Sequence, residues 1–485
     1  MDIPCSPTEA SLIEHLAAAA AEAGVKAWLI GGFVRDRLLG RPCADMDIVC
    51  LGDGIDLAHR MADRFRPTPQ VAFFKNFGTA HIHVQGYDIE FVGARKESYQ
   101  RGSRNPDVEP GTLQDDLQRR DFTVNALHLG LNANDHGRLH DPFEGLKDLR
   151  DGILRTPLSP DTAFSDDPLR MLRAIRFTAQ LGFTIHPATW DGIVRNRDRI
   201  RIVSQERITE ELNKMLLCPK PSVGFDILYR TGLLRLVFPQ MTELAGAETR
   251  DGQGHKDNLY HTLQVLDNIA PHTDDPWLRW AALLHDIGKP ATKRFEAGTG
   301  WTFHGHEVVG GRMVPRIFTQ LKLPQDHKMR FVRKLVELHL RPISLTQENI
   351  TDSAIRRLLF DAGEDLEALM TLCEADITSK NKAKVRRFLA NFEMVRERLR
   401  EVEEKDQLRN WQPPVTGEMI MATFGLPPSR PVGEIKTAIR EAILDGIIPN
   451  DPRAAWDYML QKASDMGIQP LHTDAAPGPT PPKTP

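Results

Sequence analysis

The stretch from Leu29 to Val49, LIGGFVRDRLLGRPCADMDIV, constrains the fold of this chain more than any other. An apolar run from Ala27 to Ile30 is followed by two glycines and by apolar residues at helical spacing. A second apolar run then closes the stretch as Asp-Met-Asp-Ile-Val. This order predicts a strand, a glycine turn, a short helix and a second strand.

The glycine turn and the second strand carry groups that suit phosphate chemistry. Gly31 and Gly32 allow the backbone to approach a phosphate chain, and the N–H groups at the start of the helix point at it. Arg35 is expected beside them in the first helical turn. Asp45 and Asp47 lie two residues apart in the strand, so both carboxylates leave the same face.

Neighbouring carboxylates repel each other unless a cation lies between them. Oxygen ligands suit Mg²⁺, which binds through one or two carboxylates together with substrate phosphates. The two features together therefore predict a magnesium-dependent nucleotidyl-transfer site. Either alone has an ordinary structural explanation, because glycines before a helix and acidic surface strands are common in α/β proteins.

Three short alternating segments that follow, Val71–Phe74, Thr79–Val84 and Tyr87–Val92, predict antiparallel strands. The last of them carries two acidic residues on one face, and a two-metal site needs a third carboxylate from a neighbouring strand. Glu90 is the preferred candidate, with Asp88 as the alternative.

A polar run over residues 94–118 predicts a mobile basic loop, whose arginines include Arg95, Arg101 and Arg104. It leads into the sequence RRDFTVNAL at residues 119–127. We expect Arg120 to bind the triphosphate of a nucleotide. We expect Asp121 and Asn125 to bind the ribose, because a carboxylate accepts hydrogen bonds from hydroxyl groups.

Length and composition set the broad class. A chain of 485 residues is too long for one core and predicts three or four domains. The net charge of -4 means that a polyanionic partner must be met by local basic surface. The five cysteines include no C-x-x-C pair, which favours a reducing compartment and excludes a disulfide scaffold. With no signal peptide and no apolar run of membrane-spanning length, we expect a cytoplasmic protein.

Four motifs carry a resemblance to a known family. In order they are LIGGFVRDRLLG, DMD, RRDFTVNAL and DDPLRMLRAIRFTAQLGF. They resemble the class II tRNA nucleotidyltransferase / poly(A) polymerase family, and the match covers most of residues 25–240. The resemblance implies an enzyme that builds or extends RNA 3′ ends without a nucleic-acid template.

The fourth motif predicts a base-selecting pair. Asp167 and Arg170 lie three residues apart on one face of a helix that begins with proline. The carboxylate accepts from the amine of cytosine or adenine, and the guanidinium donates to the adjacent ring nitrogen. Uracil and guanine present a carbonyl instead, so the pair rejects them. The resemblance implies the same role, although the family usually has Glu at the position of Asp166.

Further arginines of this region are expected to bind nucleotide or RNA phosphates. Arg173 and Arg176 follow on the predicted template helix and are assigned to the nucleotide. The arginines that we expect to face RNA are Arg195, Arg197, Arg199, Arg201 and Arg207.

From about Gly252 the motifs contain histidine rather than arginine, on mostly helical segments. The set resembles the HD-domain phosphohydrolases and includes the adjacent His-Asp pair that names them. Mixed imidazole and carboxylate ligands hold one or two ions of Mn, Fe, Ni or Zn that activate water on a phosphate ester. The predicted ligands are His261, His285, Asp286, His306, His339 and Asp376, with His255, His304 and Asp257 in reserve.

The last part of the chain predicts a charged helix over Val385–Lys405 and a break at Pro413-Pro414. Residues 415–451 resemble the family's tail, with a helix capped at Thr416-Gly417 and another over Val432–Leu444. Its expected role is to dock the tRNA acceptor arm by shape and phosphate contacts. The Pro-rich segment beyond Leu471 is expected to be disordered.

The predicted fold class is α+β, with a small N-terminal nucleotidyltransferase head that contains a mixed β-sheet, followed by helical parts. The predicted divisions are an N-terminal helix (1–24), the head (25–155), a helical template and RNA-binding domain (156–250), an HD domain (251–380), a helical tRNA-binding tail (381–470) and a disordered tail (471–485).

The leading hypothesis is a CCA-adding tRNA nucleotidyltransferase, whose partners are the tRNA 3′ end, CTP and ATP. With the same chemistry, the alternatives are a poly(A) polymerase or an enzyme that adds only CC or only A. An HD phosphodiesterase or phosphatase whose head binds RNA belongs to a different class. A non-catalytic RNA-binding module is the least favoured, because it would need neither of the two metal-binding sets.

Overall fold

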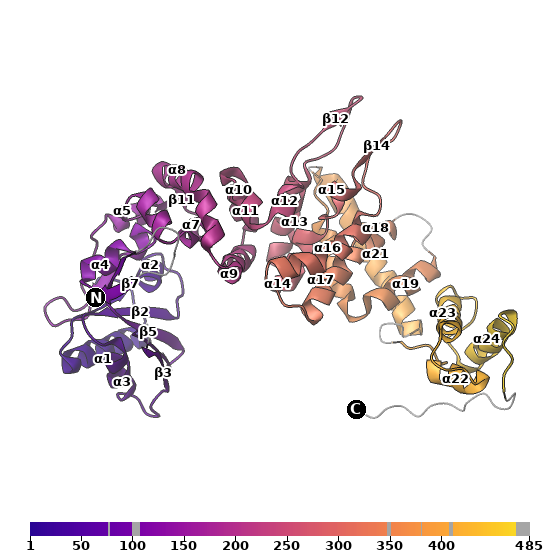
Figure 1. The fold of residues 1–485 in the computed structure, drawn as a ribbon, viewed down its shortest axis with the longest axis horizontal. Coiled ribbons are helices and arrows are strands. Elements are labelled where there is room, and N and C mark those ends of the chain that lie inside the picture. Colours follow the sequence, from indigo (N-terminus) through magenta and orange to yellow (C-terminus); the bar gives the residue numbers. More distant parts are fainter. Residues whose placement is uncertain (76–77, 99–106, 347–350, 380, 407–410, 472–485) are drawn as a thin grey trace. The chain divides into compact units, whose positions relative to one another are not determined.

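The structure, a computed structural model, describes residues 1–75, 78–98, 107–346, 351–379, 381–406 and 411–471 (Figure 1). The chain divides into two units, Met1–Glu243 and Leu244–Pro485. A mixed sheet with helices forms the N-terminal part of the first unit, and the second unit is mainly helical. The predicted α+β class is confirmed, whereas the finer six-part division stays a prediction.

The sheet of the first unit has seven strands in the order β3-β4-β5-β2-β1-β8-β9. Strands β2 and β5 run parallel, and the other neighbouring strands are antiparallel. Strand β1, the glycine turn, a helix and β2 follow one another along the chain, which confirms the predicted order. The strands are β1 (Ala27–Ile30), β2 (Asp45–Cys50), β3 (Val71–Phe74), β4 (Thr79–Val84), β5 (Tyr87–Gly93), β8 (His128–Gly130) and β9 (Leu139–His140).

Helices α1 (Pro7–Ala23) and α3 (Gly54–Ala62) pack against each other beside this sheet, and α2 (Gly32–Leu38) joins β1 to β2. Helix α1 begins at Pro7, because Ser6 and Glu9 form a capping box that satisfies the first N–H groups.

The described residues 94–98 and 107–118 form regular structure where a loop was expected. Strand β6 (Arg95–Ser98) pairs with β7 (Asp107–Pro110), and α4 (Leu113–Gln118) follows. A capping box between Thr112 and Asp115 begins α4, a signal that the polar composition of this run concealed. The predicted loop residues Arg101 and Arg104 lie outside the described residues. The motif at 119–127 contains the short 3-10 helix η2 (Thr123–Asn125).

Helix α7 (Leu169–Leu181) is the centre of the helical part of the first unit. It packs against α9 and α10 through a buried face that includes Met171, Leu172 and Ile175. The helix begins after Pro168, which is its N-cap, and ends at Gly182 in the left-handed conformation. The other elements of this region are α5 (Gly145–Asp151), β10 (Ile153–Leu154), α6 (Pro160–Asp166), β11 (Thr184–Ile185), α8 (Pro187–Asn196), η3 (Arg197–Ile202), α9 (Gln205–Leu216), α10 (Pro221–Thr231), α11 (Leu233–Val237) and α12 (Pro239–Thr242).

The second unit is built around α14 (Pro276–Leu284), which packs against α13 and α17 and buries Trp280 completely. Two short hairpins accompany the helices, β12 (Thr249–Arg250) with β13 (Gln253–Gly254) and β14 (Arg294–Glu296) with β15 (Gly300–Thr302). The other helices are α13 (Asn258–Ile269), η4 (Ala270–His272), α15 (Lys289–Thr292), α16 (His306–Gln320), α17 (His327–Leu338), α18 (Leu340–Ser344), α19 (Asp352–Ala362), η5 (Gly363–Asp365), α20 (Leu366–Ala375) and α21 (Lys382–Asp406).

Within the predicted tail, the described residues 411–471 contain three helices that follow α21, namely α22 (Gly417–Phe424), α23 (Arg430–Leu444) and α24 (Pro452–Asp465). Thr416 caps α22 as predicted, and α24 lies beyond the helices expected from the sequence. The three helices share a small core that includes Ile435, Ile439 and Met459. Within the described residues, no helix combines the length and apolar character needed to cross a membrane.

The tail core generates a stability prediction. Ile439 is fully buried in this core, so Ile439→Ala should destabilise the tail by about 2–5 kcal/mol through lost burial and an unfilled cavity. Hydrogen exchange of α22–α24 measures this effect. Ile447→Ala is the matched control, because that side chain is 68% exposed and its loss should change little. Equal protection in the two variants would contradict the described core.

Candidate active site

An acidic face is formed where β2 and β5 run side by side in parallel. Asp45 lies opposite Asp88, and Asp47 lies opposite Glu90. Because side chains two residues apart leave the same face of a strand, the four carboxylates belong to one surface of the sheet. The pairing of Asp47 with Glu90 brings together two residues that are far apart in the sequence.

The glycine turn lies directly against this acidic face. Gly31 has φ 86°, a conformation that favours glycine, and it precedes the first residue of α2. A Cβ atom at this position would meet Oδ2 of Asp47 at 3.0 Å. Glycine is therefore needed here both for the turn and for the close approach of the backbone to the carboxylate.

The turn, the acidic face and α7 enclose a cavity of about 710 Å³. Most predicted site residues of the first unit line it, whereas Asp167 and Arg170 are not among its described lining residues. The predicted residues in the cavity are Gly31, Gly32, Arg35, Asp45, Asp47, Glu90, Arg120, Asp121, Asn125, Arg173 and Arg176, together with the alternative carboxylate Asp88.

Two carboxylates of the acidic face, Asp47 and Glu90, lie in an environment that resists negative charge. Burial raises the pKa of Asp47; Arg120 opposes this rise and Asp45 adds to it. Burial, with the charge of Asp47, also raises the pKa of Glu90. A cation between these oxygens would relieve both effects, so the donor set fits a hard divalent ion.

The alternative third carboxylate, Asp88, has a different environment. His83 Nδ1 lies 2.8 Å from Asp88 Oδ1 and His81 Nε2 lies 3.2 Å from it. The hydrogen bond from His83 leads the effects that lower the pKa of Asp88. Asp88 already has imidazole partners, whereas Glu90 lies beside Asp47, so the geometry favours Glu90 as the third carboxylate.

A hydrogen-bonded chain crosses the cavity from α2 to α7. Arg35 donates to Asn125 Oδ1 at 2.7 Å, and Asn125 Nδ2 donates to Asp121 Oδ1 at 2.9 Å. Asp121 Oδ2 accepts from Arg173 at 2.7 Å. Burial alone would raise the pKa of Asp121, but Arg173 and the hydrogen bond from Asn125 lower it to about 2. Asp121 is therefore an ionised acceptor in the lining of the cavity.

Phe177 of α7 brings three guanidinium groups together. The Cζ atoms of Arg35, Arg173 and Arg176 lie 4.9, 5.5 and 4.2 Å from the centre of its ring. Cations at such distances are attracted by the electron-rich face of an aromatic ring. Arg176 also pairs with Glu211 at 2.6 Å, which fixes it to α9. Phe177 was not expected as a site residue, because an aromatic residue in a helix usually indicates core.

Asp116 is a second residue that the motif analysis missed. Its side chain is completely buried and pairs with both Arg119 and Arg120, the latter at 3.0 Å. These contacts hold Arg120 next to Asp47. The spacing of three and four residues before two arginines was the available signal, since such pairs meet on a helix.

The predicted base-selecting pair lies beside the cavity. Arg170 donates to the backbone carbonyls of Ala163, at 3.1 Å, and of Arg119. Asp167 precedes α7, accepts from the backbone N–H of Leu169 and lies 3.7 Å from Arg207. In this state both side chains therefore contact protein groups near the start of α7.

The arginines expected to face RNA are partly engaged within the protein. Arg195 pairs with Asp161 at 3.1 Å, and Arg199 donates to the Ser165 carbonyl at 2.6 Å. Arg197 donates to the Thr231 carbonyl at 3.4 Å, whereas Arg201 is exposed. Their contact with RNA stays a prediction.

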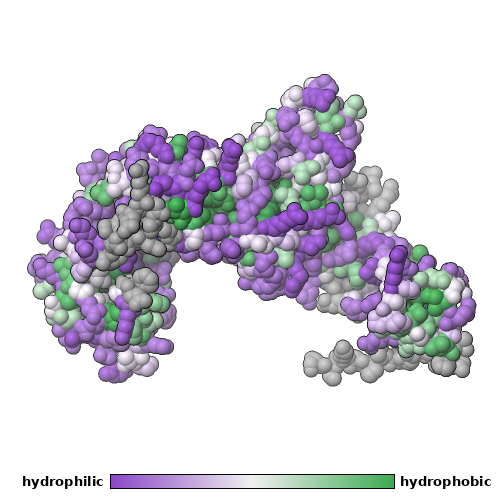
Figure 2. Space-filling view, viewed as in Figure 1, coloured by the Kyte–Doolittle hydropathy of each residue, from purple (hydrophilic) through white to green (hydrophobic). Residues whose placement is uncertain are grey.

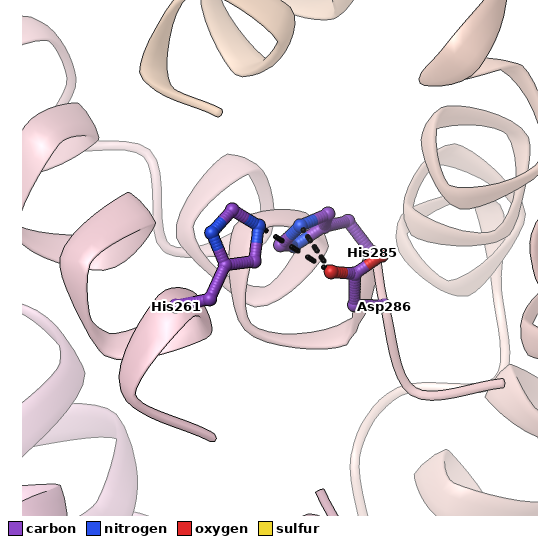
Figure 3. A group of neighbouring side chains, drawn as sticks. All are labelled: His261, His285 and Asp286. Carbon is purple, nitrogen blue, oxygen red and sulfur yellow. Dashed lines mark ion pairs between the residues drawn. The ribbon is translucent and has the colours of Figure 1, made fainter. Parts of the chain in front are cut away.

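The second unit brings all six predicted HD residues together around Asp286. Oδ2 of Asp286 lies 3.4 Å from His261 Nε2 and 3.3 Å from His285 Nε2, and Figure 3 shows both imidazoles pointing at this carboxylate. Oδ1 lies 3.2 Å from His306 and 3.9 Å from His339. Asp376 Oδ1 completes the group at 2.9 Å from His261.

The orientation of the four imidazoles favours metal binding. In each ring Nδ1 lies within 3.0 Å of a backbone carbonyl or, for His261, of the Thr378 hydroxyl. An Nδ1–H bond of this kind leaves Nε2 free to bind a metal and fixes the ring. All four Nε2 atoms are turned towards the two aspartates. The ligands form two groups that share Asp286, so the arrangement has room for one or two ions.

The buried carboxylates of the cluster also favour positive charge beside them. Burial would lower the pKa of His285, but Asp286 and Asp376 raise it to about 10. Despite burial, the neighbouring histidines hold the pKa of Asp286 well below its usual range. The described part of the chain contains two groups of three potential metal ligands whose ligand atoms all lie within 4.8 Å of one another. Both groups belong to this cluster. The head carboxylates share a cavity without forming so tight a group, as expected for oxygens that repel each other.

The three reserve residues have other positions. Asp257 caps α13 by accepting from the N–H groups of Leu259 and Tyr260. His304 is exposed. His255 lines a cavity of about 460 Å³ together with His261, Asp286 and Lys289.

Three family models match the chain in order along its length. The poly A polymerase head domain matches residues 27–155, and the probable RNA and SrmB-binding site of polymerase A matches residues 182–244. The HD domain matches residues 258–381. This order defines a nucleotidyltransferase that carries an HD domain. Both kinds of domain generally use divalent metal ions.

Curated relatives agree over most of the chain. An A-adding tRNA nucleotidyltransferase of Deinococcus radiodurans is 35% identical over 71% of this chain and 79% of its own length. A multifunctional CCA protein of Methylococcus capsulatus is 34% identical over 73% of this chain and 81% of its own length. The chain belongs to the class II tRNA nucleotidyltransferase / poly(A) polymerase family.

Solved structures share the fold. The Bacillus stearothermophilus CCA-adding enzyme in complex with CTP aligns with a TM-score of 0.68 and 22% identity, over 96% of this chain and 99% of that one. The Thermotoga maritima CCA-adding enzyme complexed with tRNA aligns with a TM-score of 0.58 and 19% identity, over 94% of this chain and 96% of that one.

The contacts of Asp116 generate a prediction about Arg120. Asp116→Asn should raise the KM for nucleotide by about tenfold or more, because breaking a buried ion pair on one side is costly and leaves Arg120 without its anchor. Nucleotide titration in an incorporation assay measures the KM. Asp115→Asn is the matched control, since Asp115 bonds Thr112 of its own turn. An unchanged KM in Asp116→Asn would show that Arg120 needs no anchor.

Proposed function

We propose that this chain is a CCA-adding tRNA nucleotidyltransferase, which transfers CMP and AMP from CTP and ATP to tRNA 3′ ends without a nucleic-acid template. The observation that carries the proposal is one cavity in which the acidic face of β2 and β5, the glycine turn and the guanidinium groups of α7 meet. Several relatives of similar length, named multifunctional CCA proteins, support it.

Asp45, Asp47 and Glu90 are the proposed ligands of Mg²⁺ in the head. Their fit rests on oxygen donors on one face and on the raised pKa values of Asp47 and Glu90. When bound, Mg²⁺ favours ionisation of the attacking hydroxyl and balances the charge of the leaving group.

The remaining groups of the cavity orient the reactants. In the proposed reaction the tRNA 3′-OH attacks the α-phosphate of the nucleotide, and pyrophosphate leaves. The backbone of Gly31 and Gly32 and the guanidinium of Arg120 hold the triphosphate. Asp121 and Asn125 hold the ribose, because the ionised Asp121 accepts from hydroxyl groups.

Selection of the base is assigned to Asp167 and Arg170 on the basis of hydrogen-bonding chemistry and family resemblance. Arg170 contacts backbone carbonyls in the present structure, so reading a base requires it to exchange these bonds for bonds to the nucleotide. Both groups lie at the start of α7, whose next turns carry Arg173, Arg176 and Phe177 into the cavity.

A second activity is proposed for the HD domain, a metal-dependent phosphohydrolase reaction. The Nε2 atoms of four histidines and the carboxylates of Asp286 and Asp376 suit one or two ions of Mn, Ni, Fe or Zn. Such ions, when bound, activate water for attack on a phosphate ester. The observation that favours this function is the complete set of potential ligands around Asp286. The imidazole of every histidine in this set is held by a hydrogen bond at Nδ1.

Incubation of tRNAs that end before C, before CC or before CCA with labelled CTP and ATP tests the main proposal. Addition of both C and A in the order CCA is expected. Addition of only A, as the name of the Deinococcus radiodurans relative describes, or of only CC or long A tracts, would replace it with the corresponding alternative.

The two proposed chemistries should separate by mutation. Asp45→Ala/Asp47→Ala should abolish nucleotide incorporation and leave metal-dependent hydrolysis of a 2′,3′-cyclic phosphate intact, because the two ligand sets lie in different units. His285→Ala should do the reverse. Incorporation that survives the double alanine change would overturn the assignment of the head.

Base selection generates a separate prediction. Arg170→Ala should lower the preference for CTP and ATP over UTP and GTP by at least about tenfold, since the hydrogen bonds that distinguish the bases are lost. Competition between labelled nucleotides measures this ratio. Asp191→Asn, an exposed change on α8, serves as the control. A ratio that is unchanged in Arg170→Ala would place base selection elsewhere.

A further inference from the structure

Phe177 is an apolar residue in a cavity whose other lining residues are mostly polar. Its side chain belongs to the lining of the cavity in the first unit, although the residue is only 5% exposed. On the face of this unit that Figure 2 shows, the surface is mainly hydrophilic and apolar residues form scattered patches. The groups that contact the ring indicate what it does in such a place.

Three guanidinium groups from two helices gather around this ring. Arg173 and Arg176 precede Phe177 on α7, whereas Arg35 comes from α2. All three Cζ atoms lie 5.5 Å or less from the ring centre. We call these three arginines the guanidinium cluster. Like charges that share one ring repel each other, so the cluster needs attraction from other groups.

Carboxylates supply one part of that attraction. Each guanidinium group of the cluster has a carboxylate partner within 2.8 Å, namely Asp36 for Arg35, Asp121 for Arg173 and Glu211 for Arg176. A phosphate chain in the cavity would carry negative charge of its own and would compete with these carboxylates for the N–H groups. Binding of phosphate therefore weakens this part of the attraction.

The aromatic ring supplies an attraction that phosphate does not replace. A cation is drawn to the electron-rich face of the ring, and a guanidinium group held in this way can still donate N–H groups to phosphate oxygens. The ring itself is fixed by Phe122, which is completely buried and packs edge to face against Phe177 with ring centres 5.9 Å apart. Phe122 follows Asp121 directly in the chain, so the ring is fixed from the motif at 119–127.

We infer that Phe177 is a positioning residue of the nucleotidyl-transfer site, and that its ring holds the guanidinium cluster where the cluster binds the phosphate chain of the incoming nucleotide. The inference rests on the function proposed above for this cavity. It adds three cations to the phosphate-binding groups named there, which are the glycine turn and Arg120. Phe177 acts through these arginines and not through a contact of its own with the nucleotide.

Substitutions at this position separate the aromatic ring from its bulk, in the full chain with Mg²⁺. Phe177→Leu keeps an apolar side chain and removes the ring, whereas Phe177→Tyr keeps the ring. Phe225→Leu is the matched control, because Phe225 of α10 is completely buried and no cation lies over its ring among the described residues. Calorimetric titration gives the Kd of CTP and of inorganic tripolyphosphate, and addition to tRNA gives KM and kcat.

In Phe177→Leu we expect both Kd values and the KM for nucleotide to rise about tenfold, because the attraction that holds the guanidinium cluster is lost. The kcat and the preference for CTP over UTP should change little, since base selection is assigned to other residues. Phe177→Tyr should stay close to wild type in every measurement. Phe225→Leu should lower the unfolding temperature, as loss of a buried ring does, and leave both Kd values unchanged.

A series of fluorinated rings tests the electrostatic part at nearly constant shape. Replacement of Phe177 by 4-fluoro-, 3,5-difluoro- and 3,4,5-trifluorophenylalanine withdraws electrons from the ring face in steps and so weakens its attraction for cations. The Kd of tripolyphosphate should rise with each added fluorine. The same series at Phe225 should leave this Kd unchanged. A ring that only fills space would not respond to the number of fluorine atoms.

A Kd of tripolyphosphate that stays constant along the series at Phe177, or rises equally along the series at Phe225, would overturn the inference. A rise for CTP without a rise for tripolyphosphate would also overturn it, because the cluster would then contact another part of the nucleotide. Either result, with C and A still added to tRNA by the wild type, would leave the proposed function in place. Wild-type protein that binds CTP and responds to the series, but adds neither C nor A, would remove the proposed function alone.

Discussion

Repulsion between carboxylates on neighbouring parallel strands is the constraint around which the first unit is arranged. The parallel pairing of β2 with β5 places Asp47 beside Glu90, and burial raises the pKa of both groups. Such a face is unfavourable by itself and becomes favourable with a bound cation. Gly31 and Arg120 surround the same carboxylate, so the metal-binding and phosphate-binding parts of the proposed reaction lie next to each other.

The second unit also brings potential metal ligands together, but with different donor atoms. There three imidazoles are oriented by a backbone carbonyl three residues earlier in the chain, and that of His261 is oriented by the Thr378 hydroxyl. Asp286 serves two ligand groups, one through each oxygen. The nitrogen donors of this cluster and the oxygen donors of the head favour different classes of metal ion.

Local patterns predicted much of the fold and of both sites. The glycine turn and the Asp45/Asp47 strand follow from hydrophobic periodicity and from the positions of the glycines within short stretches. The strands and helix at 95–98, 107–110 and 113–118 were not predicted, because the cap at Thr112 lies in a polar run whose composition is typical of a loop. The contacts of Arg170 were not predictable, since backbone carbonyls from another segment leave no mark in a sequence. Asp116 and Phe177 were missed because their importance depends on which arginines fold against them.

The guanidinium groups around Phe177 already have acidic partners. Arg35 pairs with Asp36, Arg173 with Asp121 and Arg176 with Glu211. A polyphosphate entering the cavity must compete with these carboxylates for the same hydrogen bonds. The Arg173–Asp121 pair also joins α7 to the segment that follows α4. A phosphate that draws Arg173 away from Asp121 would therefore cost the protein one of the bonds between these two segments.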